Sequence, residues 1–255
     1  MLRKGDLTQG GIITTLLQFT LPMLAGSLLQ QCYNIADTLI VGQCIGANAL
    51  AAVGSAYTLM VFLISILLGL SMGSGTVFSL QYGAGDLSAL RRSIYVSLLL
   101  IGTVTILLNV AVFLWLDPIL RWLQVPYDIY SLMRNYLWII FWGIVFTFLY
   151  NFYAALLRAV GDSVTPLWFL AVSVVLNIGL DLFLILVLDQ GIEGAAVATV
   201  IAQGTAASGI LLYTYKTRPE LRLHREDMCF DRSSLREITS FSTLTCVQQS
   251  VMNFG

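Results

Sequence analysis

The sequence contains few charged residues for its length. Only 11% of the 255 residues are Asp, Glu, Lys or Arg, whereas soluble domains carry about 25%. Hydrophobic residues make up 58%. This balance argues against a soluble enzyme, a nucleic-acid-binding domain or a disordered scaffold. Because 13 basic residues oppose 14 acidic ones, the net charge of -1 gives no reason to expect a nucleic acid or another polyanion as a partner.

Residues that build catalytic and metal sites are also scarce. The single histidine, His224, lies in a charged segment, so no proton relay within the apolar stretches uses histidine. The four cysteines are Cys32, Cys44, Cys229 and Cys246, and their spacing matches neither a metal site nor a disulfide framework. The sequence has no nucleophile–base pair and no phosphate-binding loop. We therefore expect a protein that is not an enzyme and that has no cofactor.

Long uncharged stretches, in contrast, are abundant. A helix of roughly 20 apolar residues crosses a hydrocarbon core about 30 Å thick. Five stretches are long enough: Ile12–Ala36, Ser93–Leu116, Asn135–Leu157, Ser163–Leu180 with its continuation to Leu188, and Gly194–Tyr215. Runs such as Leu98–Ile101 show no alternation of polar and apolar residues, so we expect helices rather than a barrel. The sequence thus predicts an all-α integral membrane protein.

The segment between Asp37 and Asp86 is also uncharged. It forms either one long helix after a turn at Gly42 and Gly46, or two short helices. A single crossing, with the amino terminus in the cytoplasm, leaves only Arg121 and Arg134 outside. The other basic residues then all lie inside: Arg3, Lys4, Arg91, Arg92, Arg158, Lys216, Arg218, Arg222, Arg225, Arg232 and Arg236. Two crossings would move Arg91 and Arg92 outside, so the positive-inside rule favours one crossing and six spans.

These patterns divide the chain into three parts. We expect residues 1–215 to form a six-helix amino-terminal transmembrane lobe. Residues 216–237 carry charges of both signs and contain Pro219, which predicts a cytoplasmic linker. Residues 238–255 are uncharged again and are expected to begin a seventh transmembrane helix. The pair Gln248–Gln249 echoes Gln30–Gln31, which leaves open whether a second copy of the six-helix unit starts there.

Two acidic residues stand in otherwise apolar surroundings. A carboxylate at the bilayer centre costs about 2.5 to 3.5 kcal/mol on insertion scales, so Asp37 and Asp181 indicate a functional site. The alternative is that each lies near the headgroups and is simply hydrated. That alternative is stronger for Asp37, which stands close to Gly42, than for Asp181, which shares a helical face with Asn177.

A count of depth places several polar side chains in one layer. At about 1.5 Å of rise per residue from the outer loops, the layer contains Asp37, Asp181, Thr199 and Tyr136, with Asn177 one turn deeper. Oxygen ligands suit a hard monovalent cation, and two close carboxylates share a proton because both cannot ionise cheaply. We therefore predict a monovalent cation or proton site here. Depth alone does not show that these side chains face one another.

The first stretch combines a polar stripe with a proline. Gln30, Tyr33 and Asn34 precede Asp37, so part of the expected helix faces protein or a water-filled cavity. Pro22 removes a backbone hydrogen bond and permits a kink that would move Asp37. Proline is also common in transmembrane helices that merely bend.

Small residues gather in the uncharged segment between Asp37 and Asp86. Gly69, Gly73 and Gly75, with Ser71 and Ser74, allow a neighbouring helix to approach closely. We interpret them as packing residues.

Several motifs resemble those of one transporter family. They are Pro22-Met23-Leu24, the run from Gln30 to Thr38, the run from Gly42 through Gly46 to Gly54, Gln81-Tyr82-Gly83-Ala84-Gly85, Arg158-Ala159-Val160-Gly161-Asp162 with Thr165-Pro166, and the pair Asn177 and Asp181. In this order and spacing, the chain resembles the amino-terminal half of a multidrug and toxic compound extrusion (MATE) transporter. The resemblance is to the bacterial branch that groups with DNA-damage-inducible-type members.

The resemblance implies a fold and a function. The fold would be two six-helix lobes around a central cavity, so the expected partners include a carboxyl-terminal lobe and the bilayer of a bacterial plasma membrane. The function would be export of amphipathic, often cationic compounds by alternating access, driven by inward Na+ or H+ flow. By matching position, Asp37, Asn177, Asp181 and Thr199 would form the ion site with Tyr136 nearby, Tyr33 and Asn151 would line the lobe beside the polar stripe, and Pro22 would be the bending point.

Two other functions fit parts of the sequence. A lipid-linked oligosaccharide flippase of the same superfamily shares the helical plan, but its cavity is expected to hold Arg and Lys for a pyrophosphate. No basic residue of this chain lies deep in a span. A non-transporting membrane subunit or fragment is the second alternative, supported by the abrupt carboxyl end. The oxygen ligands suit Na+ and H+ alike, and the sequence does not name the drug.

Overall fold

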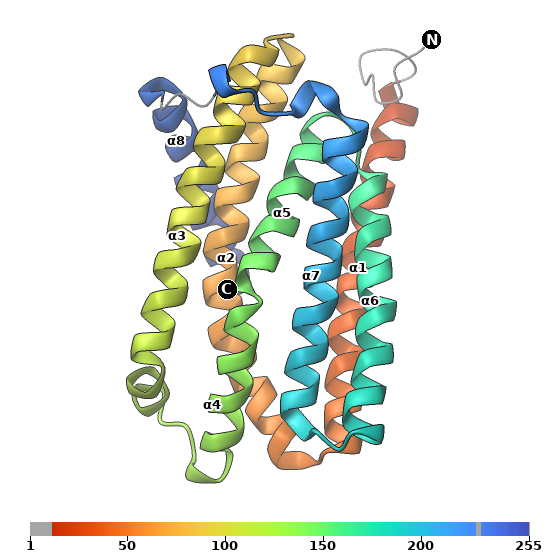
Figure 1. Cartoon of the computed structure of the whole chain (residues 1–255), viewed down its shortest axis with the longest axis vertical. Helices are drawn as coiled ribbons and strands as arrows, with labels where there is room; N and C mark the ends of the chain where they lie inside the picture. Colours follow the sequence, from red (N-terminus) through yellow and green to blue (C-terminus); the bar gives the residue numbers. More distant parts are fainter. Residues whose placement is uncertain (1–11, 228–230, 255) are drawn as a thin grey trace.

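The computed structural model describes residues 12–227 and 231–254, and within these ranges it consists of helices and turns without strands. The main helices are α1 (Ile12–Cys44), α2 (Ala47–Gly83), α3 (Leu87–Trp122), α4 (Tyr127–Trp142), α5 (Ile144–Ala159), α6 (Val164–Leu182), α7 (Gly191–Thr217) and α8 (Arg232–Phe254). A π-helical turn, η1 (Phe183–Val187), continues α6, and two short 3₁₀ turns, η2 (Pro219–Leu221) and η3 (Arg225–Asp227), follow α7. The long helices lie side by side along one axis (Figure 1). The predicted all-α fold is confirmed.

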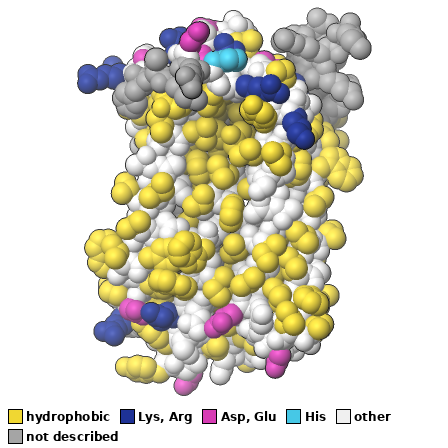
Figure 2. Space-filling view, viewed as in Figure 1, with side chains coloured by type: hydrophobic (Ala, Val, Ile, Leu, Met, Phe, Trp, Pro, Cys, Tyr) yellow, Lys and Arg dark blue, Asp and Glu magenta, His cyan; other side chains and the backbone are white. Residues whose placement is uncertain are grey.

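The distribution of charge along the bundle is that of a membrane protein. On the face shown in Figure 2, charged side chains gather at the two ends and leave an uncharged belt between them. Within the described ranges, four helical units are long and apolar enough to cross a membrane: α2, α3, α6 continued by η1, and α7. α4 and α5, bent by 46° at a short break, together make a fifth such unit. The crossing by α1 and the cytoplasmic position of the amino terminus stay predictions.

The first turn of the chain lies later than predicted. α1 continues past Ala36 to Cys44, so Gly42 is helical, and the turn falls at Gly46, whose φ of 116° only glycine adopts easily. Val41 is fully buried, which explains why the helix extends this far. α2 then forms one long helix rather than two short ones, in agreement with the prediction from the distribution of basic residues.

The third predicted span, Asn135–Leu157, is not one straight helix. It is divided between α4 and α5, which are separated by Gly143. The N–H of Gly143 donates to Ile140 O at 2.8 Å, a tighter turn than in an α-helix. Asn109 Nδ2 of α3 donates to Phe141 O at 2.7 Å. The Asn109 side chain thus gives a backbone carbonyl at the break a hydrogen-bond partner. Such partners are needed in the bilayer interior, where no water is present to supply them.

The last helix starts earlier than predicted. α8 begins at Arg232 rather than at Ile238 because Asp231 accepts hydrogen bonds from the N–H groups of Ser233 and Ser234, at 3.0 and 3.3 Å. The hydrogen bond from the Ser234 hydroxyl, with those from the backbone, lowers the pKa of Asp231. α8 therefore begins within the charged segment that was expected to be linker.

α7 is the helix around which α4, α5 and α6 pack. Ala196, Ala198 and Ala202 of α7 are each no more than 2% exposed. A methyl group added at Gly209 would lie 2.6 Å from Phe169 Cε1 of α6. Small side chains thus let several helices approach α7 at once, which is the usual basis of helix association in lipid.

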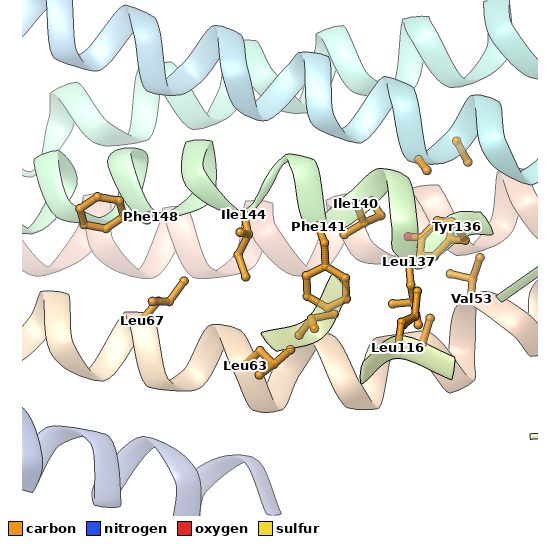
Figure 3. Close-up of a cluster of buried hydrophobic side chains, with 14 of the residues drawn as sticks. Val53, Leu63, Leu67, Leu116, Tyr136, Leu137, Ile140, Phe141, Ile144 and Phe148 are labelled. Carbon is orange, nitrogen blue, oxygen red and sulfur yellow. The ribbon is translucent and has the colours of Figure 1, made fainter. Parts of the chain in front are cut away.

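Larger apolar side chains fill the space between α2 and the α4–α5 unit. Phe141 of α4 and Ile144 of α5 point toward α2, which carries Leu63 and Leu67 (Figure 3). Because lipid tails are as apolar as these side chains, the contact is stabilised by close packing rather than by removal of water. This packing gives α4 a fixed position on one side.

α2 and α8 meet along a line of small residues. A methyl group at Gly69 would lie 2.6 Å from Cys246 Cα, and one at Gly73 would collide with the Ser242 backbone. Ser242 Oγ donates to Leu70 O at 3.3 Å. The glycines therefore allow close helix approach as predicted, and the helix that approaches is α8.

Candidate functional site

Asp37 and Asp181 meet inside the bundle. Asp37 lies on α1, Asp181 lies in the last turn of α6, and their carboxyl groups are within hydrogen-bonding reach of each other. The Asp181 side chain is 0% exposed. The Oδ1 atom of each acid is buried and finds no hydrogen-bond donor among the described residues. Each acid thus has one buried oxygen that lacks a donor, an arrangement that a shared proton or a cation would satisfy.

Asn177 holds the other oxygen of Asp181. It precedes Asp181 by one turn of α6 and is fully buried. In one orientation of the Asn177 amide, both of its ends have hydrogen-bond partners. Nδ2 then donates to Asp181 Oδ2 at 2.9 Å, and Oδ1 accepts from the Thr199 N–H at 3.3 Å. In the opposite amide orientation, Nδ2 would instead lie 3.4 Å from Thr199 Oγ1. The first orientation gives Asp181 a donor, so it is the one we adopt.

Thr199 joins the site from α7. Its side chain is 5% exposed, and its hydroxyl lies 3.3 Å from the hydroxyl of Tyr33 on α1. Either hydroxyl is able to donate in this pair. α7 thus contacts both α6, through Asn177, and α1, through Tyr33.

Tyr136 completes the cluster from α4. It is 4% exposed and lies near enough to Asp37, Asp181 and Tyr33 to interact with them electrostatically. Helices α1, α4, α6 and α7 therefore bring together the four side chains that the depth count placed in one layer. We define these residues, Asp37, Asp181, Asn177, Thr199 and Tyr136, with Tyr33 at their edge, as the candidate ion site, called the ion site below.

The other residues selected from the sequence lie outside this cluster. Gln30 is exposed on α1, and Asn34 is half-buried there. Asn151 Nδ2 donates to Thr147 O of its own helix at 2.8 Å. Pro22 lies within α1, which continues as a helix through it. The expected cavity-lining roles of Gln30, Tyr33, Asn34 and Asn151, and the hinge role of Pro22, stay predictions.

The residues present fit a monovalent ion. The described residues contain no group of three or more His, Cys, Asp or Glu that could hold a metal ion together. The oxygen atoms at the site come instead from two carboxylates, a hydroxyl and neighbouring neutral groups. A hard cation of low charge, or a proton between the acids, matches this set better than a transition metal does.

Sequence reasoning missed a second polar group beside the site. Thr147 Oγ1 of α5 donates to Gln203 Oε1 of α7 at 2.6 Å. Gln203 follows Thr199 by one helical turn, so the two face the same side of α7. A glutamine within an apolar span was the available signal, but its partner on α5 depends on the packing of the two helices.

Comparisons with known proteins identify the family of this chain. Residues 22–183 match the family model MatE. This chain belongs to the MatE family. Two similar MatE relatives are the probable multidrug resistance protein YpnP of Bacillus subtilis, 37% identical over 211 residues, and the multidrug export protein MepA of Staphylococcus aureus, 28% identical over 251 residues. The alignments cover 83% and 95% of this chain but 47% and 54% of those proteins.

The MatE fold is also found among solved structures. An outward-facing conformation of a multidrug resistance MATE family transporter superposes with a TM-score of 0.92 at 23% sequence identity. The superposition covers 100% of this chain and 56% of that one. The chain therefore spans about half the length of the relatives it matches, as expected of an amino-terminal MatE half.

Proposed function

We propose that the protein containing this chain is a secondary multidrug efflux transporter. It would export amphipathic, cationic compounds across a bacterial plasma membrane in exchange for Na+ or H+. Membership of the MatE family and the names of the relatives YpnP and MepA support efflux. The observation that carries ion coupling is the contact between Asp37 and Asp181, each with one buried oxygen that lacks a donor.

Because of the acid pair, an ion would stabilise one arrangement of α1 more than another. Two carboxylates close together in a dry layer repel each other, whereas a proton or Na+ between them removes the repulsion. An ion therefore favours the arrangement in which α1 lies against α6. Loss of the ion favours an arrangement in which Asp37 moves away. A ligand shifts such an equilibrium only by its different affinities for the two states.

α1 is the element suited to this movement. It packs chiefly against α6 and contacts α2 and α7 less. Several of its large apolar side chains, such as Leu28 at 68% exposed, are not covered by the rest of the bundle. A drug that binds the ion-free arrangement better would be released when the ion binds, and this reciprocal effect is the coupling between the two ligands.

Dye efflux from vesicles tests the proposal. Vesicles would hold the product of the whole open reading frame, and ethidium efflux would be driven separately by a Na+ gradient and by a pH gradient. We expect Asp37→Asn and Asp181→Asn to lower ion-driven efflux at least about tenfold, because neither asparagine binds the ion as a carboxylate does. Unchanged efflux in both variants would refute ion coupling at this pair.

The chain offers a matched control. Asp189→Asn removes a carboxylate from an exposed turn outside the ion site. Asp189 has a φ of 52°, a conformation that asparagine tolerates well, so the substitution preserves the turn. We expect this variant to retain wild-type efflux. The gradient that drives efflux in the wild type identifies the coupling ion.

A further inference from the structure

The break between α4 and α5 lies against α7. A methyl group at Gly143 would lie 2.8 Å from Val200 Cγ2 of α7 and 3.1 Å from Ile140 O. The first distance is shorter than carbon atoms approach without a shift, and valine has little rotameric freedom to yield. Glycine at this position is therefore what allows α4 and α7 to touch here.

A hydrogen bond fastens the same contact one turn further on. Thr147 Oγ1 donates to Gln203 Oε1 at 2.6 Å and lies 3.4 Å from Gly143 O. Gln203 Oε1 is also only 3.5 Å from the position that a Cβ of Gly143 would take. The break, the threonine and the glutamine thus form one small contact between the α4–α5 unit and α7.

This contact fixes the distance between two sides of the ion site. Tyr136 stands about two turns before Gly143 on α4, and Thr199 directly precedes Val200 on α7. On its other side, α4 is held by the packing of Phe141 toward α2 (Figure 3). α4 therefore lies between α2 and α7, and the Gly143–Val200 contact sets how near Tyr136 comes to the acid pair.

We propose that Gly143 is a positioning residue for the ion site. By letting α4 touch α7 at Val200, it holds Tyr136 beside Asp37 and Asp181, and the Thr147–Gln203 bond maintains the contact. This inference rests on the proposed function, because it assigns Gly143 to the site where the coupling ion binds. A side chain at position 143 would push α4 from α7, draw Tyr136 away from the acids and weaken ion binding.

Thermal unfolding of the purified full-length product measures this affinity directly. NaCl would be titrated against choline chloride at constant ionic strength, and in a separate series the pH would be varied without Na+. An ion that binds only the folded protein raises Tm by an amount that grows with ln(1 + [ion]/Kd), so the rise begins near the Kd. We expect Gly143→Ala to raise the apparent Kd for Na+ or H+ by about fivefold, an effect about as large as that of one hydrogen bond. Gly204→Ala, whose methyl would lie 3.6 Å from Phe146 Cδ2 in ordinary contact, is expected to match the wild type.

Two further variants distinguish an effect on the position of Tyr136 from a general loss of protein stability. Adding Val200→Ala to Gly143→Ala removes the methyl group that causes the collision, so we expect the ion affinity to return. In a Tyr136→Phe background, Gly143→Ala should weaken ion binding no further, because its effect acts through the Tyr136 hydroxyl. Should Gly143→Ala not fold, Thr147→Val is expected to weaken ion binding while Thr147→Ser, which keeps the hydroxyl, retains it.

The outcomes distinguish this inference from the proposed function. Suppose that an ion raises the Tm of the wild type and of Gly143→Ala over the same concentration range, and that the variant differs only by a lower Tm without the ion. Ion binding by the protein would then stand, and the positioning role of Gly143 would be wrong. A further loss in the Tyr136→Phe background also overturns the inference. If neither Na+ nor pH produces a concentration-dependent rise in the Tm of the wild type that Asp37→Asn abolishes, the proposed function and the inference both fail.

Discussion

The hydroxyl groups of Tyr33 on α1 and Thr199 on α7 lie 3.3 Å apart, which links the helix that carries Asp37 to the helix at the centre of the bundle. Because α1 contacts α7 at few positions, this bond is well placed to report whether α1 is docked. The same threonine contacts Asn177 through its backbone N–H. Thr199 therefore touches both helices that supply the acids.

Replacing Thr199 should weaken ion binding. Thr199→Val keeps the shape of the side chain but removes the hydroxyl, so Tyr33 loses its partner and the site loses one oxygen. We expect the half-saturating ion concentration for ethidium efflux to rise about fivefold, as for loss of one hydrogen bond. Thr199→Ser should remain close to the wild type. Equal ion dependence in the valine and serine variants would show that the hydroxyl has no role.

The α2–α8 contact predicts a strong effect of a single methyl group. Gly73→Ala would place that group against the Ser242 backbone, so α8 must move away from α2. Overpacking of this kind costs about 1 to 3 kcal/mol. The half-buried Cys246 would then react faster with a small, membrane-permeant maleimide in a variant whose other cysteines are serine. Gly54→Ala is the control, because nothing lies within 4 Å of the position its methyl would take; equal labelling rates in the two variants would contradict the contact.

An ion pair attaches the segment before α8 to α3. Arg91 Nε lies 2.9 Å from Asp227 Oδ2, and the two side chains are 23% and 10% exposed. We expect Arg91→Gln to loosen residues 216–227 and to speed tryptic cleavage there several-fold. Global stability should change little, because partly exposed pairs contribute about 0 to 1 kcal/mol. Arg121→Gln, at the opposite end of the bundle, is the control; cleavage as slow as in the wild type would mean that this ion pair does not hold the segment.

The start of α3 should make stability depend on acid pH. Asp86 accepts hydrogen bonds from the Ala89 N–H at 2.9 Å and from Ser88 Oγ at 2.7 Å, and these bonds lower the pKa of its carboxyl group. A group whose pKa is lower in the folded state stabilises it above its unfolded pKa, about 3.9, and loses that contribution as the pH falls. The Tm difference between wild type and Asp86→Ala should thus be largest near neutral pH and shrink below about pH 4. A difference that is constant with pH would exclude this effect.

Features that depend on local chemistry were predictable from the sequence. The burial cost of Asp37 and Asp181 identified both acids, and a fixed rise per residue placed Tyr136 and Thr199 at their depth. The bias of basic residues predicted that α2 is one long helix rather than two short ones. Each of these inferences needs only the order of residues along a helix.

Features that depend on how helices rotate and pack were not predictable. The break at Gly143 looks like any glycine in a transmembrane helix, and only the closeness of Val200 shows why it is there. The extension of α1 to Cys44 follows from the burial of Val41, a tertiary effect. The bond from Asn135 Nδ2 to Glu193 Oε1, 2.8 Å, likewise joins α4 to α7 without a sequence signal.

The central claim is that Asp37 and Asp181 bind one ion together. Infrared difference spectroscopy of the full-length product tests it most directly, because a protonated carboxyl group gives a C=O band that a carboxylate lacks. At neutral pH without Na+, we expect one such band, lost in Asp37→Asn and in Asp181→Asn alike, and displaced by saturating Na+ if Na+ is the coupling ion. The account would be contradicted if the wild type showed neither a protonated carboxyl band nor a change in its carboxylate bands on adding Na+. A protonated carboxyl band that survives in both variants would contradict it as well.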